Sequence, residues 1–281
     1  MITIGINPML TIGPVSIRWY GIMVALAIVV IVLWTLWQAK RGATLSYDTI
    51  LTGALVGIPS GVIISKLLHV VDYIVISKLH PELVNHIVDY TQHPGQIFSG
   101  GGLTIYGAVL GAALGIWVYS KFSHFQFGYV ADLVAPGVIL AQAIGRVGCT
   151  INGCCYGVPT SSPWGVIYTN SASFAYSASL ALPEGMGLHP TQVYELIFCL
   201  VIFAVLLKLK GRFKPDGSIF LIYLSLYSSW RIGIDFLREG TPFLFGLHQA
   251  QVIGTIVLAV CIPLLVLRTR WVKMGGEVGR K

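Results

Sequence analysis

Charged side chains are scarce in this chain. Asp, Glu, Lys and Arg make up 10% of its 281 residues, whereas hydrophobic residues make up 55%. A soluble domain carries roughly 25% charged residues, because it needs them to cover a surface that faces water. The shortage excludes an ordinary soluble domain, and the mean hydropathy of +0.78 agrees. The sequence therefore predicts a protein that is embedded in a lipid bilayer.

Linkers and repeats are lacking as well. No Pro/Ser-rich stretch or charge run divides the chain, so we expect one membrane-embedded domain over residues 1–281. The cysteines number five, and an odd count argues against a disulfide framework. The formal net charge of +7 would suit a nucleic-acid partner. The distribution of the basic residues favours membrane orientation instead, so we expect no nucleic acid.

Long hydrophobic runs are what the chain has in their place. Seven stretches approach the ~20 residues that cross a hydrocarbon core, and they predict an all-α, polytopic membrane protein with about seven transmembrane helices. They lie at residues 15–38, 49–70, 102–121, 127–147, 191–210, 217–237 and 246–268. The second, third and fourth are rich in glycine, which permits either close helix packing or irregular re-entrant structure. The longer connections are residues 71–101 and 148–190.

Basic residues are absent from the first seventeen positions and gather after the odd-numbered segments. Of the 18 Lys and Arg residues, 12 follow the first, third, fifth or seventh segment. Because basic loops stay in the cytoplasm, we expect an external N-terminus and a cytoplasmic C-terminus. The N-terminus lacks the basic region of a cleavable signal peptide, so the first segment should remain in the mature protein.

Four arginines lie outside this cytoplasmic set, at the predicted external ends of segments one, four and six. They are Arg18, Arg146, Arg231 and Arg238. A guanidinium in a bilayer is expensive and usually marks a ligand site, and its planar fork of donors suits phosphate oxygens. We therefore expect a shared site for an anionic lipid at the external leaflet. The alternative is that each arginine only anchors its helix in the head-group region.

Arg146 lies in a Gly-rich string. Residues 145–157 read Gly-Arg-Val-Gly-Cys-Thr-Ile-Asn-Gly-Cys-Cys-Tyr-Gly, and glycine lets the backbone approach a bulky head group. Asp235 follows Arg231 by four residues, on the same helix face, where it can neutralise or orient that arginine. Arg238 is placed to share the same carboxylate. Arg146 and Arg231 are predicted to form a phosphate clamp.

Two polar residues stand at the start of the fifth segment. Glu195 lies inside a hydrophobic helix and must find a cationic or donor partner, for which the arginines are the candidates. His189 precedes a proline at a predicted first helical turn. It is either a proton acceptor or a residue that caps the helix by hydrogen bonding. Both are candidate site residues.

Three of the cysteines, Cys149, Cys154 and Cys155, stand close together in the sequence. Their C-x4-C-C spacing fits none of the common zinc patterns, and no nearby histidine completes one, so we expect no metal. A disulfide from Cys149 to Cys154 or Cys155 is the alternative on an oxidising external side. We expect these cysteines to be structural and not to carry a transferred group.

Together these strings resemble the prolipoprotein diacylglyceryl transferase family, and the resemblance runs nearly from end to end. It is carried by Gly13-Pro14 with Arg18-Trp19-Tyr20-Gly21, by Gly101-Gly102-Leu103 with Tyr106-Gly107, by residues 145–157 and 189–195, and by Tyr227, Arg231, Asp235 and Arg238. The family's seven-span fold with an external N-terminus agrees with the charge count.

The resemblance implies a reaction. The diacylglyceryl group of phosphatidylglycerol moves to the thiol of the lipobox cysteine in a prolipoprotein signal peptide, forming a thioether and releasing glycerol phosphate. This is the first step of bacterial lipoprotein maturation. The resemblance also implies a multi-pass protein of the bacterial cytoplasmic (inner) membrane, with its active site toward the outer leaflet and with no cofactor.

The resemblance also implies site residues. The predicted catalytic residues are Arg146, Arg231, Tyr20, Tyr106 and His189. The predicted substrate-binding residues, besides Arg146 and Arg231, are Asn152, Gly157, Tyr227, Asp235, Glu195 and Arg238. The chain departs from the family at Cys149, where Asn is common, at Cys154 and Asp235, where Glu is common, at Lys66, where Arg is common, and at Tyr106, where many members have His. The proton acceptor therefore stays open between His189, Tyr106 and a tyrosine activated by arginine.

Two other function classes compete with the transferase. One is a non-catalytic lipid-binding or lipid-moving membrane protein of the same fold, in which the altered signature has lost the transfer step. The other is an ion or metal transporter that uses the external cysteines. Transfer of a labelled diacylglyceryl group to a lipobox peptide would distinguish the transferase from both of these alternatives.

Overall fold

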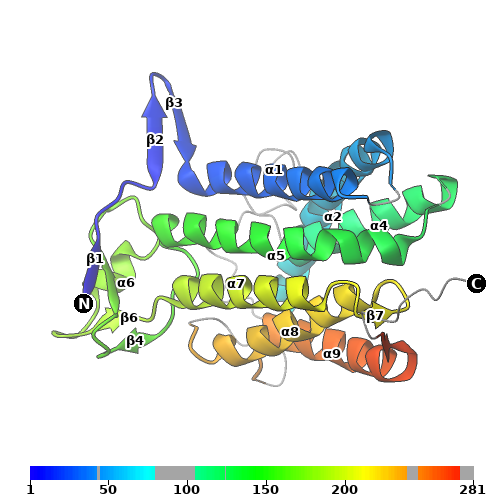
Figure 1. Cartoon of the computed structure of the whole chain (residues 1–281). Coiled ribbons are helices and arrows are strands. Elements are labelled where there is room, and N and C mark those ends of the chain that lie inside the picture. The colour runs from blue at the N-terminus through cyan, green and yellow to red at the C-terminus, as the bar shows by residue number, and fades with distance from the viewer. Residues whose placement is uncertain (43–44, 80–104, 124, 239–245, 273–281) are drawn as a thin grey trace, which may run out of the picture. The chain divides into compact units, whose positions relative to one another are not determined.

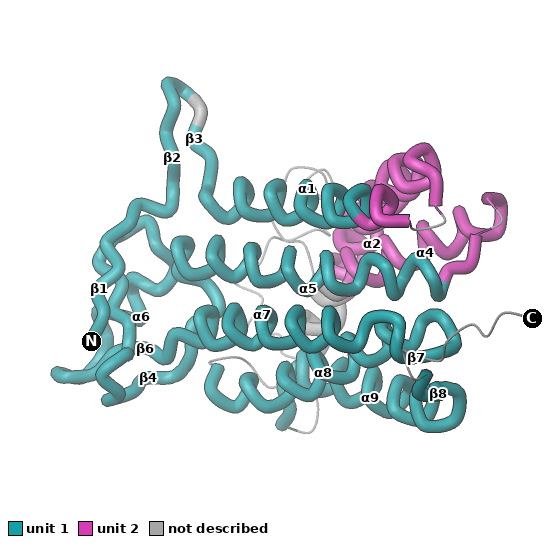
Figure 2. The backbone as a smooth tube through the Cα atoms, in the orientation of Figure 1, with its two compact units in different colours: residues 1–37, 128–281 teal, residues 38–127 magenta. Residues whose placement is uncertain are grey.

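The chain forms two compact units. The computed structural model describes residues 1–42, 45–79, 105–123, 125–238 and 246–272. Unit 1 comprises residues 1–37 and 128–281, and unit 2 comprises residues 38–127 (Figure 2). Each unit has its own packed helices, described separately below. That residues 1–281 act as one functional domain stays a prediction.

Each of the seven hydrophobic segments contains a long helix in the described part of the chain (Figure 1). These are α1 (Trp19–Lys40), α2 (Tyr47–Leu79), α4 (Ile105–Ser123), α5 (Phe127–Asn152), α7 (Thr191–Leu209), α8 (Ser218–Asp235) and α9 (Gln249–Arg268). Among the described residues, α1, α2, α5, α7 and α9 contain stretches long and apolar enough to cross a membrane. A mainly helical membrane protein is confirmed, whereas the seven-span count and the sides of the termini stay predictions.

Two helices extend by a turn or more beyond the C-terminal ends of the hydrophobic runs that predicted them. Residues 71–79 continue α2 and residues 148–152 continue α5, although hydropathy assigns both to connections. The polar end of α5 is satisfied locally, because the Thr150 hydroxyl donates to the Arg146 carbonyl at 2.8 Å. The helix then ends at Gly153, whose φ of +69° suits the left-handed position that terminates helices. The rest of the first predicted connection, residues 80–101, lies outside the described residues.

Short strands correct the all-α prediction. They are β1 (Ile2–Ile4), β2 (Met9–Ile12), β3 (Val15–Arg18), β4 (Pro159–Thr160), β5 (Val166–Tyr168), β6 (Gly187–Leu188), β7 (Phe213–Lys214) and β8 (Arg270–Trp271). The β2–β3 hairpin takes residues 15–18, which hydropathy assigns to the first helix. A hydropathy run cannot separate a short strand of β-branched residues from the helix that follows it. Gly13, with φ +61°, makes the turn.

A small sheet covers one end of the unit 1 helices. Its strand order is β1-β5-β6-β4, with β1 parallel to β5 and the other pairs antiparallel. Its hydrophobic core packs Val166, Tyr168, Ala175 and Leu188 beneath the short helix α6 (Tyr176–Leu180). In Figure 1 the labelled strands β1, β4 and β6 lie at one end of α5 and α7, and β7 lies at the other.

Three helices, α5, α7 and α8, form the core of unit 1. Their buried side chains are Ala135, Ile139, Ala143, Cys199, Ile202, Leu206, Ile219 and Tyr223. Helix α1 packs on α5 at two glycines. A Cβ at Gly137 would lie 2.8 Å from Trp34, and one at Gly148 would lie 2.9 Å from Met23. Small residues allow this close approach inside a bilayer, where helices associate by packing.

A carboxylate on α5 fixes the start of α8. Asp132 accepts hydrogen bonds from the backbone N–H of Gly217 and of Phe220, each at 2.8 Å. These N–H groups lie at the start of α8, where backbone donors have no acceptor within their own helix. The negative charge also suits the positive end of the helix dipole. Asp132 therefore sets the position of α8 against α5.

Unit 2 consists of α2 and α4, which pack through glycines. A Cβ at Gly61 would lie 2.9 Å from the Ala108 carbonyl, and one at Gly115 would lie 2.6 Å from the Ser60 hydroxyl. Gly57 and Gly61 are four residues apart on α2, as are Gly111 and Gly115 on α4. This small-xxx-small pattern lets two backbones approach closely. The glycines of the second and third segments thus serve helix packing.

Candidate active site

The site begins with a buried carboxylate, Glu195, in the first turns of α7. Its side chain is 1% exposed, and Arg146 Nη2 donates to its Oε1 at 2.7 Å. The Tyr227 hydroxyl donates to the same oxygen at 2.8 Å. Arg238 Nη1 lies 3.9 Å from Oε2. Two hydrogen-bond donors, from α5 and α8, and a more distant arginine from the segment after α8 therefore converge on one carboxylate, as predicted for a glutamate inside a hydrophobic helix.

A second buried carboxylate, Asp235, ends α8. Its Oδ1 lies 3.1 Å from Arg231 Nη1, one turn back on the same helix, as the i,i+4 spacing predicts. Its Oδ2 lies 2.9 Å from Nδ1 of His248. The expected sharing of Asp235 with Arg238 is wrong, because α8 ends at Asp235 and the chain turns there. Arg238 lies in the following segment and pairs with Glu195.

The pairing of His248 could not be read from the sequence. His248 is the N-cap of α9, and its backbone N–H donates to the Gln251 side chain at 2.9 Å. A polar residue before an apolar run with Gln three positions later is a helix-start signal, and nothing in it indicates Asp235 as a partner. The contact depends on how α8 and α9 pack, so it belongs to the tertiary structure.

The ion pairs of Glu195 and those of Asp235 lie next to each other, with Tyr227 between them. Tyr227 and Arg231 are one turn apart on α8, and the charges of Arg146 and Arg231 both act on the tyrosine hydroxyl. The ion pairs contain three arginines and two carboxylates, so their summed formal charge is +3 − 2 = +1. The arginine side chains in them are only 11–13% exposed. The combined site is therefore a partly desolvated, net positive group.

Arg18 lies at the same end of unit 1 but makes different contacts. Its Nη1 donates to Asn152 Oδ1 at 3.0 Å, and its guanidinium carbon lies 4.7 Å from the Phe174 ring centre. Tyr20, at the start of α1, is 40% exposed, and its hydroxyl lies within range of the Arg146 charge. Asn152 thus holds Arg18 at the end of α5, while Tyr20 borders the Arg146 group.

His189 and Gly157 lie together beside the site. Nδ1 of His189 lies 3.2 Å from the Tyr194 hydroxyl, to which Trp164 Nε1 donates at 2.7 Å. The Gly157 backbone N–H donates to the His189 carbonyl at 2.9 Å. A Cβ at Gly157 would lie 2.7 Å from that of His189 and would also meet the Leu237 carbonyl. Glycine is therefore required where three chain segments meet.

Tyr106 belongs to unit 2, in the first turn of α4. Its side chain lies outside the described part of the structure, as do residues Gly101, Gly102 and Leu103 of the same string. Its role therefore stays a prediction.

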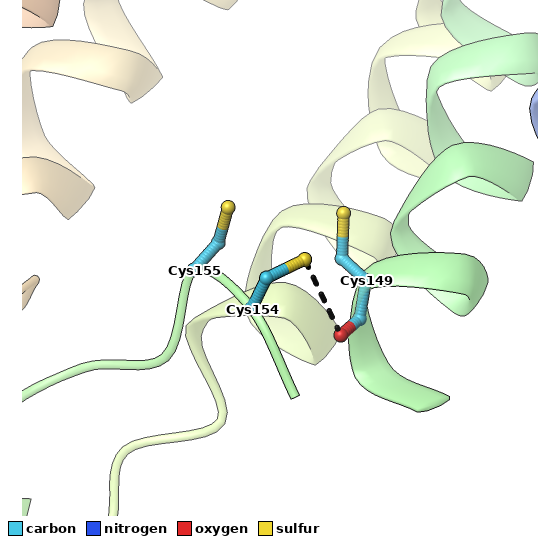
Figure 3. Close-up of side chains that lie close together, drawn as sticks. All are labelled: Cys149, Cys154 and Cys155. Carbon is cyan, nitrogen blue, oxygen red and sulfur yellow. Dashed lines mark hydrogen bonds between the residues drawn. The ribbon is translucent and has the colours of Figure 1, made fainter. Parts of the chain in front are cut away.

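The cysteines are close in space. The Sγ atoms of Cys149, Cys154 and Cys155 all lie within 4.8 Å of one another (Figure 3), and the Cys154 thiol faces the Cys149 carbonyl at 3.9 Å. All five cysteines of the chain are free thiols, so the disulfide considered from the sequence is not formed here.

Fold and site together define a helical membrane protein whose buried arginines and carboxylates gather at one end of its helices. The chain belongs to the prolipoprotein diacylglyceryl transferase family, since the family model matches residues 7–267. A phosphatidylglycerol–prolipoprotein diacylglyceryl transferase of Dehalococcoides mccartyi is 47% identical over 274 residues, 96% of each chain. Enzymes of the same name from Clostridium tetani and Trichormus variabilis are each 34% identical, over 88% and 86% of this chain and 92% and 82% of their own.

Proposed function

We propose that this chain transfers the diacylglyceryl group of phosphatidylglycerol to the lipobox cysteine thiol of a prolipoprotein signal peptide. The cysteine sulfur forms a bond to the glyceryl carbon, and the bond from that carbon to the phosphate oxygen breaks. Glycerol phosphate leaves with the electron pair of that bond, and the thiol proton passes to an acceptor. The observation that carries the proposal is the pair of buried arginine–carboxylate groups in a chain of this family.

The charge of the site suits this leaving group. The phosphodiester of phosphatidylglycerol carries one negative charge, and the ion-pair groups sum to +1. As the carbon–oxygen bond breaks, more negative charge develops on the phosphate. Guanidinium groups that are already held in place stabilise that charge without reorganisation, more strongly in a partly desolvated site than in water.

The carboxylates orient the arginines for that task. An arginine has five N–H donors in a rigid fork, and the Glu195 contact uses the Nη2 group of Arg146. The carboxylate can therefore hold one part of the guanidinium while the remaining fork binds phosphate oxygens. Asp235 does the same for Arg231. In this proposal Arg146, Arg231 and Arg238 bind the phosphate, and Glu195, Asp235 and Tyr227 position them.

Smaller roles follow for the other predicted residues. Asn152 holds Arg18 at the rim of the site, and Gly157 keeps the loop after α5 against Leu237 and His189. Tyr20, at the start of α1, stays one of the candidate acceptors for the thiol proton that the family resemblance suggests. His189 and Tyr106 are the other candidate acceptors.

For the topology we propose seven spans in the bacterial cytoplasmic membrane, with the site at the outer leaflet. The supporting feature is the charge distribution along unit 1. β7 pairs with β8, which sets Lys214 beside Arg270 at the end of unit 1 away from the small sheet. The arginine site lies where α5 and α8 end and α7 and α9 begin. Because basic loops tend to stay in the cytoplasm, this distribution supports a site on the outside and a C-terminus on the inside.

The experiment is direct. Purified protein in detergent is given phosphatidylglycerol labelled in its diacylglyceryl group and a lipobox peptide, with a peptide carrying Ser in place of the lipobox Cys as control. Label transferred only to the cysteine peptide, with glycerol phosphate released in equal amount, is the expected result. Binding of phosphatidylglycerol without transfer would replace the proposal with the non-catalytic lipid-binding alternative.

A further inference from the structure

Three thiols converge beside the arginine site. Cys149 lies in the last turn of α5, and Cys154 and Cys155 follow the glycine that ends this helix. Their Sγ atoms lie within 4.8 Å of one another although no bond joins them. Figure 3 shows the side chains of Cys149 and Cys155 pointing the same way, with the Cys154 sulfur close to Cys149. The transfer reaction proposed above uses none of these thiols.

The loop that carries them is fixed by α7. The Thr191 hydroxyl donates to the Cys155 carbonyl at 2.6 Å, and the Gln192 amide donates to the Cys154 carbonyl at 2.8 Å. Both donor side chains are 1% exposed. Cys155 adopts φ +64°, a left-handed conformation that a non-glycine residue rarely takes. The backbone is thus held by its carbonyls while the thiols face one another.

We propose that Cys149, Cys154 and Cys155 form a binding site for a soft, thiophilic metal cation, with Cu⁺ as the best match. Thiolates are the ligands that select Cu⁺ over harder cations. Metal–sulfur bonds of about 2.3 Å set three sulfurs on one metal roughly 4 Å apart. The observed spacing therefore needs shifts of only a fraction of an ångström. Structural zinc sites take four protein ligands, whereas this group, among the described residues, offers three.

Metal binding requires the thiolate form of cysteine, and the positive charges of Arg146 and Arg238 lie near the three thiols. A three-thiolate Cu⁺ site carries a net charge of −2, which those arginines offset. The C-x4-C-C spacing predicted no metal because it fits none of the common zinc patterns. Zinc patterns do not apply to a Cu⁺ site, so the proposal differs from that prediction.

The test uses the full-length protein, reduced and kept free of oxygen. Cu⁺ is titrated against a chromophoric chelator, and one Cu⁺ per chain is expected to move to the protein. The triple variant Cys149→Ser/Cys154→Ser/Cys155→Ser should lose this binding. The matched variant Cys199→Ser/Cys261→Ser, which removes two buried thiols on α7 and α9, should retain it. Equal Cu⁺ binding by the triple variant, or equal loss in the matched variant, would overturn the proposal.

A second measurement needs no variant, so it does not depend on how the substitutions fold. Alkylation of each cysteine in the wild-type protein is followed by mass spectrometry with and without Cu⁺. Cu⁺ should slow alkylation at Cys149, Cys154 and Cys155 and leave Cys199 and Cys261 unchanged. Tighter binding of Zn²⁺ than of Cu⁺ would refute the assignment to Cu⁺. If two of the three cysteines formed a disulfide in the isolated protein and did so again after reduction in the presence of Cu⁺, they would be a redox pair and the metal site would be refuted.

A separate observation concerns His248, and this inference rests on the proposed function. Asp235 bridges two side chains, with Arg231 Nη1 at 3.1 Å from one oxygen and His248 Nδ1 at 2.9 Å from the other. Asp235 itself is only 4% exposed. We infer that His248 is a positioning residue, which donates from Nδ1 to Asp235 and so fixes the carboxylate that aims Arg231 at the lipid phosphate.

Steady-state transfer kinetics test this role. His248→Leu should lower kcat/KM for phosphatidylglycerol severalfold and leave KM for the acceptor peptide unchanged, because it loosens a phosphate ligand and does not touch the peptide. His248→Asn, whose side-chain amide can still donate to Asp235, should recover most of the loss. Equal effects of Leu and Asn would refute the positioning role. Absence of transfer by the wild-type protein would refute the proposed function itself, which is a different outcome.

Discussion

Replacing Arg146 separates its observed role as the counter-ion of Glu195 from its proposed role as a ligand of the lipid phosphate. Arg146 Nη2 lies 2.7 Å from Glu195 Oε1, and the carboxylate is 1% exposed. In Arg146→Ala the buried carboxylate loses its nearest cation. Breaking a buried ion pair from one side destabilises by about 3–5 kcal/mol. Tyr227 still donates at 2.8 Å and Arg238 remains at 3.9 Å, so we expect the low end, about 3 kcal/mol.

The double variant Arg146→Ala/Glu195→Gln removes the orphaned charge together with its partner. It should recover most of the lost stability, since removing both members of a buried pair costs far less than removing one. Transfer should not recover, because the phosphate has lost its guanidinium. Loss of one preorganised donor to a developing charge lowers turnover by about 100-fold or more. Arg146→Lys should restore little activity, because lysine keeps the charge but loses the fork.

Both quantities can be measured on the same preparations. Thermal unfolding in detergent is followed with a thiol-reactive dye that reports exposure of Cys149, Cys199 and Cys261, which are buried in the native protein. Transfer is measured with labelled phosphatidylglycerol and the lipobox peptide. If the double variant regained wild-type transfer along with its stability, Arg146 would be a structural counter-ion only, and the phosphate role would be refuted.

Three further predictions concern helix packing, the start of α8 and the membrane topology. Gly157→Ala should destabilise the protein by about 1–3 kcal/mol, because its Cβ would collide with neighbouring backbone; Gly233→Ala, where nothing lies within 4 Å, is the matched control, and equal unfolding temperatures would contradict the packing argument. Asp132→Ala should lower the free energy of unfolding by about 1–2 kcal/mol, because the N–H groups of Gly217 and Phe220 lose the carboxylate that accepts their hydrogen bonds. Transfer per folded molecule should stay unchanged. Single cysteines at Ser161 and Asp216, in a background lacking the native five, should label from opposite sides of the membrane, and labelling from one side would disprove the seven-span topology.

The sequence by itself determined the broad outcome. Scarce charge and seven apolar runs predicted a helical membrane protein, because a bilayer admits long stretches of backbone only when they are internally hydrogen-bonded. The same scarcity made each arginine and carboxylate in an apolar segment conspicuous. Glu195 and the i,i+4 pair of Arg231 and Asp235 were identified on that ground, since charges in such surroundings require partners.

Only the tertiary structure decided which partners they take. Arg238 follows Asp235 by three residues, yet it pairs with Glu195 because α8 ends between them. His248 reaches Asp235 through the packing of α8 and α9, which no local pattern encodes. The same holds for the thiols of Cys149, Cys154 and Cys155, which meet because a helix end turns back on itself. Spacing along the chain determines contacts within one regular helix, whereas contacts across turns and between helices depend on where each helix ends and which neighbours it packs against.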